Sequence, residues 1–350
     1  MTLKLTDLKQ PGYERLVLAE DAAAGLRALI CIHSTALGPA AGGCRMWAYG
    51  SDAEAITDVT RLARGMTYKN AMADLGLGGG KSVIIGDARR DKTPDLMRAF
   101  GRAVEALEGQ YYTAEDVGIS TGDMALAAEE TAYAVGLAGG DHGSGDPSPW
   151  TAEGVFRCLK VGAAHVWGTE DVAGKRVLVQ GLGHVGLSLA EKLHAAGATL
   201  IVTDINAAAL EDARTRLGAG VIAPDAVFAQ DIDIFAPCAL GAVLTADTVP
   251  ALTAKLVCGA ANNQLATPEI ADRLKARGIT YLPDYVVNAG GIISVAGEIH
   301  KRGENYRRGR LDAIATRVAE MLTRAKAENR TTVQIADAMV ERMLAGAKAA

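Results

Sequence analysis

Two lysines in the first half of the chain lie in surroundings that are unusual for a lysine. Lys69 follows the run GMTY, and Lys81 follows three glycines and precedes an apolar run that begins after Ser82. Most lysines are solvated surface groups, but a lysine flanked by glycines and apolar residues has little access to bulk water. Burial and a second nearby cation both favour the neutral form of an amine. Because a neutral amine can accept a proton near pH 7, this pair points to general-base chemistry.

A glycine-rich loop that carries a lysine can also hold a phosphate group. The pattern for such a loop, GxxxxGK[ST], needs a glycine five residues before Gly80, and Leu75 stands there instead. The phosphate-loop interpretation therefore does not fit the segment around Lys81.

A second constellation, in the other half of the chain, combines a strand, a glycine motif and a helix in that order. The apolar strand Val177–Gln180 leads into the motif GLGHVG, whose glycines are Gly181, Gly183 and Gly186, and a helical pattern follows. Such glycines allow a tight turn, close approach of the backbone to a pyrophosphate, and close packing of helix on sheet. The helix N-terminus offers N–H groups to the phosphates. The motif therefore predicts a dinucleotide site.

The next strand indicates which dinucleotide is bound. It ends at Asp204, 18 residues after Gly186. A carboxylate at this place accepts hydrogen bonds from the adenosine ribose hydroxyls and repels a 2′-phosphate. Residues 205–209 include no arginine or lysine that could pair with such a phosphate. The sequence therefore predicts NAD rather than NADP as the cofactor.

Composition limits the kind of protein that carries these motifs. The chain has 350 residues, which suggests about two domains. Its net charge of −5 argues against nucleic acid or an anionic membrane as the main partner. The five cysteines form no CxxC pair, so we expect no metal site. Because the sequence shows neither a signal-peptide pattern nor a run of 18 apolar residues, we expect a cytoplasmic protein.

Strand-like and helix-like segments alternate along the whole chain. In the first half we expect strands over residues 13–20, 26–33, 82–85 and 110–113. Helices are expected there over residues 52–68, with Asp52 as N-cap, 93–108 and 121–135. In the second half a helix over 151–167 precedes near-continuous apolar strands over 176–180, 199–203, 220–222, 231–235, 256–259 and 279–282. Such strands, alternating with helices, are typical of a parallel sheet covered on both faces. Two further helices are expected over 309–327 and 332–347.

These patterns predict an α/β protein of two domains with a cleft between them. The N-terminal substrate domain, with a mixed sheet, is expected over residues 1–148. A Rossmann-type domain with a doubly wound parallel sheet is expected over residues 149–324, and helices at about 325–350 would pack back on the first domain. A loop rich in glycine and proline, residues 139–149, would join the two domains.

Several separate motifs, taken in order, resemble one family. They are GPAAGGCRM at 38–46, GMTYKN with Lys69, GGGKS with Lys81, TAEDVG with Asp116, the GLGHVG turn, PCA at 237–239, ANN at 261–263 and NAGG at 288–291. Together they resemble the NAD-dependent amino acid dehydrogenases of the glutamate/leucine/phenylalanine/valine dehydrogenase superfamily. The resemblance runs from about Tyr13 to His300. It looks closest to the leucine and phenylalanine dehydrogenases, which act on apolar amino acids.

The resemblance implies a reaction and a role for each matching residue. An apolar L-amino acid, of the branched-chain type, would lose a hydride to NAD and be hydrolysed to the 2-oxo acid and ammonia. Lys81 matches the catalytic lysine and Asp116 a second proton carrier, while Lys69 matches the lysine that binds the substrate carboxylate. Further substrate-binding positions would be Ala41, Gly42, Gly43, Ala114 and Asn263. The cofactor would be bound by Ser148, Thr151, Gly181, Gly183, His184, Val185, Gly186, Asp204, Cys238, Ala239, Ala261 and Asn262. Because the family is oligomeric, a homo-oligomer is expected.

The preferred side chain of the substrate stays open between aliphatic and aromatic. Ala41 stands where the aliphatic-specific relatives carry a larger leucine, and a smaller residue deepens the pocket. One methylene changes discrimination by only about 1–3 kcal/mol. A phenylalanine dehydrogenase with the same mechanism is therefore the alternative.

Two other functions are weighed against the dehydrogenase. A 2-hydroxy-acid dehydrogenase needs a histidine paired with an acid, and none of His142, His184 and His300 stands in an obvious pairing. A non-catalytic NAD-binding regulatory protein would be expected to lack one of the two lysines or Asp116, and all three are present.

Overall fold

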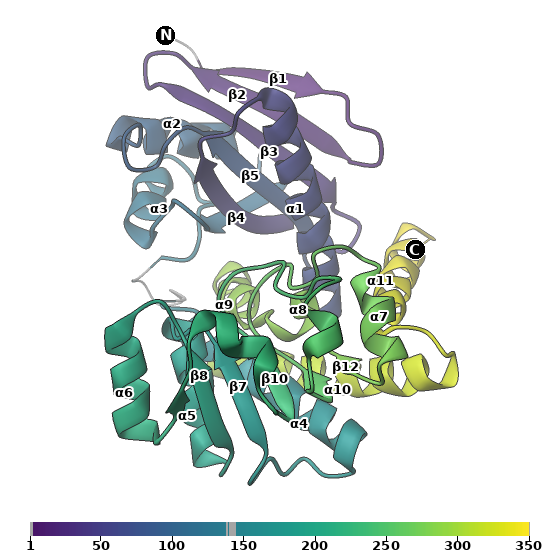
Figure 1. Cartoon of the computed structure of the whole chain (residues 1–350). Coiled ribbons are helices and arrows are strands. Elements are labelled where there is room, and N and C mark those ends of the chain that lie inside the picture. The colour runs from purple at the N-terminus through teal and green to yellow at the C-terminus, as the bar shows by residue number, and fades with distance from the viewer. Residues whose placement is uncertain (1–2, 138, 140–144, 350) are drawn as a thin grey trace. The chain divides into compact units, whose positions relative to one another are not determined.

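Figure 1 shows the computed structural model, which describes residues 3–137, 139 and 145–349, with side chains as far as residue 347. The chain divides into two compact units. The first unit comprises Met1–Asp146, Ser294–Arg307 and Val340–Ala350, and the second comprises Pro147–Ile293 and Arg308–Met339. Residues 140–144 of the predicted joining loop, His142 among them, lie outside the described residues. A substrate domain over 1–148 and an NAD-binding domain over 149–324 stay predictions, because compactness does not show what a unit binds.

The first unit is built on a six-stranded mixed sheet with strand order β1-β2-β3-β5-β4-β6. Its strands are β1 (Lys4–Leu8), β2 (Arg15–Asp21), β3 (Leu26–Ser34), β4 (Ala40–Trp47), β5 (Gly78–Ile85) and β6 (Tyr111–Glu115). The pairs β1–β2, β2–β3 and β3–β5 are antiparallel, whereas β4 runs parallel to both β5 and β6. The predicted mixed sheet is confirmed, with β1 and β4 as strands that the periodicity did not indicate.

Helices cover this sheet through two apolar clusters. Helix α1 (Asp52–Met72) packs Ala55, Val59 and Ala63 against one set of strand residues. Helices α2 (Pro94–Glu105) and α3 (Thr121–Ala128) contribute to a larger second cluster, which includes the fully buried Phe100. The side chains of both clusters are almost fully buried, so the sheet is a rigid support for any group that it carries.

Two helix ends differ from the sequence-based expectation. Ser51, not Asp52, is the N-cap of α1, because its hydroxyl accepts the Glu54 N–H. Helix α3 ends at Ala128, although the pattern predicted a helix to residue 135. The chain beyond it turns and then forms a single parallel bridge between Ala134 and Thr113 of β6.

Strand β4 was missed because two glycines, Gly42 and Gly43, interrupt its apolar pattern, and glycine is rare in strand interiors. The structure gives each glycine a packing reason. A Cβ on Gly42 would lie 2.0 Å from the carbonyl oxygen of Gly80, and one on Gly43 would lie 2.6 Å from that of Glu115. The absence of side chains therefore lets β4 fit between β5 and β6.

The second unit contains an all-parallel sheet with strand order β12-β11-β10-β7-β8-β9. Its strands are β7 (Arg176–Gln180), β8 (Thr199–Thr203), β9 (Gly220–Val221), β10 (Ile234–Pro237), β11 (Leu256–Val257) and β12 (Thr280–Tyr281). The order reverses between β7 and β10, which is the place where ligands bind in open α/β sheets. The predicted parallel sheet is confirmed. Strand β10 lies a few residues later than the predicted 231–235.

The helices of the second half begin with α4 (Ser148–Trp167), α5 (His184–Ala195) and α6 (Ala207–Leu217). They continue with α7 (Ile270–Ala276), α8 (Asp284–Val287), α9 (Gly290–Ile299), α10 (Glu304–Ala327) and α11 (Thr332–Ala349). In the part of the chain that the structure describes, no helix combines the length and apolarity needed to cross a membrane.

Candidate active site

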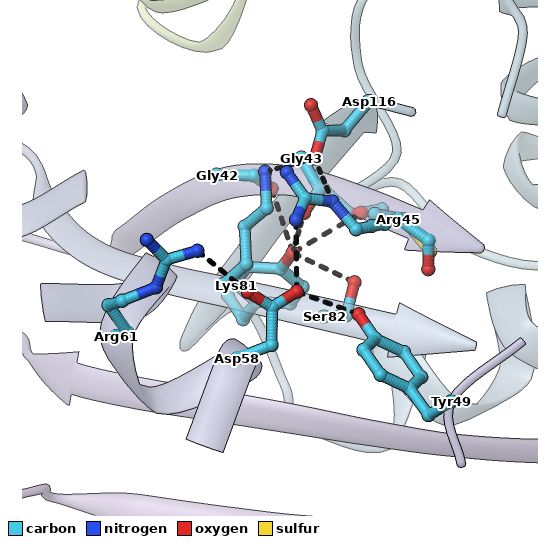
Figure 2. A network of polar contacts seen from close by, with 12 residues as sticks. Gly42, Gly43, Arg45, Tyr49, Asp58, Arg61, Lys81, Ser82 and Asp116 are labelled. Atoms are coloured by element: carbon cyan, nitrogen blue, oxygen red, sulfur yellow. Dashed lines mark hydrogen bonds and ion pairs between the residues drawn. The ribbon is translucent and has the colours of Figure 1, made fainter. Parts of the chain in front are cut away.

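Lys81 lies in the middle of β5, where its side chain is only 7% exposed. Its Nζ atom is 2.9 Å from Oδ2 of Asp116 (Figure 2). The burial expected from the flanking glycines is confirmed. The near partner of Lys81 is a carboxylate, not the second cation that the sequence suggested, so Lys81 and Asp116 form a largely buried pair of opposite charges.

Asp116 follows directly on the last residue of β6, and backbone hydrogen bonds hold the turn that carries it. The Ile119 N–H donates to the Asp116 carbonyl at 2.9 Å, and the Met46 N–H donates to the Val117 carbonyl at 2.9 Å. Burial raises the pKa of the Asp116 carboxyl, but the positive charges of Lys81 and Arg45 outweigh this effect and leave the pKa below its usual value. Asp116 is therefore an anion at neutral pH.

Lys69 lies half-buried in the last turn of α1, against the strand that carries Lys81. Two contacts fix this turn. The Asn70 side-chain amide donates to the carbonyls of Gly78 at 2.5 Å and Ala41 at 3.2 Å. A Cβ on Gly79 would lie 2.0 Å from the backbone nitrogen of Thr67, so helix and strand touch through bare backbone. The fold thus brings the helix end with one lysine onto the strand with the other.

The other predicted substrate-binding positions of the first unit belong to β4 and β6. Gly43 pairs with Ala114 in the sheet register, and a Cβ on Gly43 would lie 3.0 Å from Cβ of Asp116. Gly42 receives the Tyr111 hydroxyl on its carbonyl at 2.7 Å. Ala41 and Ala114 are both buried. Of these residues, Gly43 packs its backbone against Asp116, and the roles of all four toward a substrate stay predictions.

Sequence reasoning missed three polar residues of this region. Arg45 stands within the motif GPAAGGCRM and contacts Asp116, while Asp58 of α1 contacts Arg45. Tyr111 is fully buried at the start of β6, where its hydroxyl meets the Gly42 carbonyl and Ser82. Asp58 lies one turn after the buried Ala55 of α1, and a charged side chain next to the buried face of a helix was the available signal.

In the second unit the glycine turn has the shape that a dinucleotide needs. Gly181 has a φ of +96°, which a residue with a side chain rarely adopts. A Cβ on Gly186 would lie 2.0 Å from the Gly181 carbonyl oxygen, whereas one on Gly183 would meet nothing within 4 Å. Gly183 is the N-cap of α5 and has no side chain with which to cap it, so the helix start, with His184 and Val185, can receive a pyrophosphate.

Asp204 directly follows β8 and is fixed beside this turn. Its carboxylate accepts the Leu182 N–H at 2.5 Å and the Asn206 N–H at 2.7 Å. Each oxygen keeps a lone pair that can accept a ribose hydroxyl. The next residue, Ile205, is 96% exposed. The turn and this carboxylate together fit the adenosine end of a dinucleotide.

Most of the remaining predicted cofactor residues lie at the carboxyl ends of the central strands. The Cys238 N–H donates to the Gln180 carbonyl at 2.7 Å, and a Cβ on Gly181 would lie 2.7 Å from Cβ of Ala239. The Ala261 N–H donates to the Pro237 carbonyl at 2.9 Å. These residues therefore gather around the glycine turn.

The asparagines and the start of α4 complete the predicted set. Asn262 accepts the Asn288 side-chain amide at 2.8 Å. Asn263 has a φ of +53° and donates its N–H to Asp284 at 2.5 Å. Ser148 and Thr151 lie in the first turn of α4. No contact described for these residues tests their role toward a cofactor or substrate.

A parallel sheet with a glycine turn at its switch point, and a separate sheet with a buried lysine–carboxylate pair, define the class of dinucleotide-dependent dehydrogenases. The comparisons narrow this class. Residues 15–133 match the Glu/Leu/Phe/Val dehydrogenase dimerisation domain, and residues 205–349 match the glutamate/leucine/phenylalanine/valine dehydrogenase domain. The chain belongs to this family of oxidoreductases, which typically use a nicotinamide cofactor.

Individual relatives are similar to this chain over nearly its full length. Leucine dehydrogenase of Bacillus cereus is 45% identical over 349 residues, which cover 99% of this chain and 95% of that protein. Valine dehydrogenase of Streptomyces coelicolor is 44% identical over 342 residues, which cover 97% and 94%. Among solved structures, L-tryptophan dehydrogenase from Nostoc punctiforme has a TM-score of 0.85 and 38% identity, and covers 96% of this chain and 97% of that one. The predicted family is therefore confirmed.

Proposed function

We propose that the protein catalyses the reversible oxidative deamination of an apolar, branched-chain L-amino acid with NAD, which gives the 2-oxo acid and ammonia. The observation that carries the proposal is the buried pair of Lys81 and Asp116, with Nζ and Oδ2 2.9 Å apart. The substrate class is supported by relatives named leucine dehydrogenase and valine dehydrogenase, which match 99% and 97% of the chain.

The residues of the first unit can carry out the proton transfers of this reaction. NAD, when bound, supplies the hydride acceptor for Cα. Lys69 would hold the substrate carboxylate, and the Asp116 anion would bind the substrate ammonium and take one proton from it, so that the substrate enters the oxidation as a neutral amine. Lys81 would take a proton from the water that attacks the carbon of the resulting iminium ion, and would pass this proton to the nitrogen. It would then take the proton of the carbinolamine hydroxyl, so that the carbonyl group forms as ammonia leaves.

The preference for NAD is part of the proposal. Asp204 lies beside the glycine turn, where its carboxylate would repel the 2′-phosphate of NADP. The adjacent exposed side chain is the apolar Ile205, which offers that phosphate no partner. Both features support NAD.

An aromatic substrate is the second candidate. The solved structure from Nostoc punctiforme is named an L-tryptophan dehydrogenase. Ala41 is small and buried on β4, next to the paired glycines. A small residue there is compatible with a larger substrate side chain.

A spectrophotometric panel tests the proposal. Purified protein is given NAD and one of leucine, valine, isoleucine, phenylalanine, tryptophan or glutamate, and NADH formation is followed by its absorbance. We expect the highest kcat/KM with leucine or valine. The highest kcat/KM with phenylalanine or tryptophan would replace the aliphatic proposal with the aromatic one. Absence of NADH formation with every amino acid would overturn both.

We also infer that the enzyme is a cytoplasmic homo-oligomer. The family description of residues 15–133 as a dimerisation domain supports self-association. All five cysteines are free thiols, and four of them are buried, which agrees with a reducing compartment. Light scattering on the purified chain should give a mass of at least twice that of the monomer, and a monomeric mass would contradict the inference.

A further inference from the structure

We propose that Arg45 is a positioning residue for the deamination reaction. It holds the carboxylate of Asp116 beside Lys81, and Asp58 in turn fixes Arg45. This inference rests on the function proposed above, because it assigns Arg45 an effect on the reaction through Asp116.

The contacts form a chain of alternating charges that runs from β5 to α1 (Figure 2). Lys81 Nζ and Arg45 Nε meet the same oxygen of Asp116, Oδ2, at 2.9 Å and 3.2 Å. The other side of the guanidinium reaches Asp58, with Nη1 2.9 Å from Oδ2. A guanidinium is planar and rigid. Because the Arg45 guanidinium contacts Asp116 on one side and Asp58 on the other, it fixes the direction in which each carboxylate points.

The middle of this chain of contacts is shielded from water. The side chains of Arg45, Asp58 and Asp116 are 21%, 16% and 24% exposed. Interactions between charges that are largely removed from water are screened less than those at the surface. Two groups flank Asp58: Tyr49 donates its hydroxyl at 2.8 Å, and Arg61 contacts it at 3.0 Å while its own side chain stays 57% exposed.

Contacts other than those of Arg45 also hold the elements around Asp116. Strand β4 is held by its ladders to β5 and β6, and α1 by its apolar cluster. The turn after Asp116 has its own anchor, because Lys92 donates to the Gly118 carbonyl at 2.9 Å and pairs with Asp123 at 2.6 Å. A buried ion pair adds little net stability compared with a well-packed apolar replacement. The contact of Arg45 therefore acts on the Asp116 carboxylate itself.

This arrangement prepares Asp116 for a cationic ligand. With two cations on one oxygen, the carboxylate is fixed in place and stays ionised. Asp58 neutralises the charge of Arg45, so the four groups Lys81, Asp116, Arg45 and Asp58 carry no net charge. Without Asp58 the surroundings of Asp116 would repel the ammonium group of an incoming amino acid. Arg45 orients the anion, and Asp58 keeps the site able to accept a further positive charge.

The test uses the full chain and compares Arg45 with Arg61, the two arginines that contact the carboxylate of Asp58. Arg45→Gln removes the guanidinium next to Asp116, and Arg61→Gln removes the exposed one. We expect Arg45→Gln to lower kcat for deamination by about 10–100-fold, because misplacement of a reacting group by about 1 Å can cost 10²-fold. Its KM for NAD should stay near the wild-type value, whereas its unfolding temperature should fall, because Asp58 and Asp116 lose their shared cation. The kcat values are therefore compared at a temperature at which both proteins are folded. Arg61→Gln should keep kcat within about twofold of the wild type, as expected for an exposed ion pair.

A double-mutant cycle separates positioning from general damage to the fold. If Arg45 acts through Asp116, Arg45→Gln should change kcat by less than about twofold in an Asp116→Asn background. Full additivity of the two effects, or an Arg45→Gln enzyme with kcat within about threefold of the wild type, would overturn the proposal. Should Arg45→Gln fail to fold, Arg45→Lys and Asp58→Asn answer the same question, since each removes one link. A wild-type chain without deaminase activity would refute the proposed function instead.

Discussion

The two candidate sites are built from different parts of the chain. In the first unit, the side chains of Lys81 and Asp116 are held by other side chains. In the second unit, the glycine turn presents backbone N–H groups and open space, because glycine has no side chain. In the first unit, charges are removed from water and balanced through Arg45 and Asp58. In the second, Gly183 leaves a space that no protein atom occupies within 4 Å of an added Cβ. Proton transfer needs groups that can change charge, and binding of a pyrophosphate needs N–H groups at close range. The difference follows from these two demands.

The largest expected effect is on kcat, from a substitution that disrupts only the charged site. Lys81→Ala removes the proposed general base, and kcat should fall by at least about 10²-fold. Circular dichroism should show an unchanged fold, because the strand around Lys81 is held by ladders on both sides. Turnover near the wild-type rate would remove Lys81 from the mechanism.

The second prediction separates the two lysines. Lys69→Ala removes a charge partner of the substrate carboxylate. Since a hydrogen bond to a charged group contributes about 1.5–3 kcal/mol, the KM of the amino acid should rise by about 10–100-fold. Initial rates at varied amino acid concentration measure this directly. An unchanged KM with a lowered kcat would instead place Lys69 among the groups that transfer protons.

The third prediction concerns the cofactor. In the double variant Asp204→Ser with Ile205→Arg, serine keeps an oxygen for the Leu182 N–H, while the repulsion of a 2′-phosphate is lost and a cation is added. The ratio of kcat/KM for NADP to that for NAD should rise by about tenfold or more, the effect of one charge-assisted hydrogen bond. The Ile205→Arg single variant is the control for the added charge. Equal use of both cofactors by the wild type would contradict the role of Asp204.

The smallest expected effects come from alanine substitutions of Gly183 and Gly186. The two glycines belong to one turn, but the substitutions should differ in their effects on stability and on NADH binding. Gly186→Ala places a Cβ 2.0 Å from the Gly181 carbonyl oxygen and should lower the free energy of unfolding by about 1–3 kcal/mol. Gly183→Ala meets no protein atom, but alanine is a poorer N-cap than glycine, so it should lower that free energy by about 1 kcal/mol or less, while it weakens NADH binding. Denaturant titration and NADH fluorescence measure the two quantities. Equal NADH affinity in Gly183→Ala would show that the space at Gly183 is not used by the dinucleotide.

The same contrast explains how much could be predicted from the sequence. The dinucleotide turn is local: strand, glycines and helix follow one another, and Asp204 ends the next strand. Its elements were therefore predicted in place. The charged site is assembled from β4, β5, α1 and the turn after β6, so its members are far apart in the sequence. Lys81 and Asp116 were found through motifs. Arg45 lies in the motif GPAAGGCRM, but nothing in the sequence assigned it a role. Its strand, β4, was not predicted, because Gly42 and Gly43 interrupt the apolar pattern.

The most direct test of the different roles of the two sites is the NADH affinity of Lys81→Ala. Isothermal titration of NADH into this variant and into the wild type gives the two dissociation constants under one condition. If Lys81 serves proton transfer and the dinucleotide turn binds the cofactor, the variant should bind NADH with a Kd within about twofold of the wild type, a difference of about 0.4 kcal/mol or less. A Kd raised by about tenfold or more in a folded protein would show that Lys81 serves the cofactor, and would contradict the account.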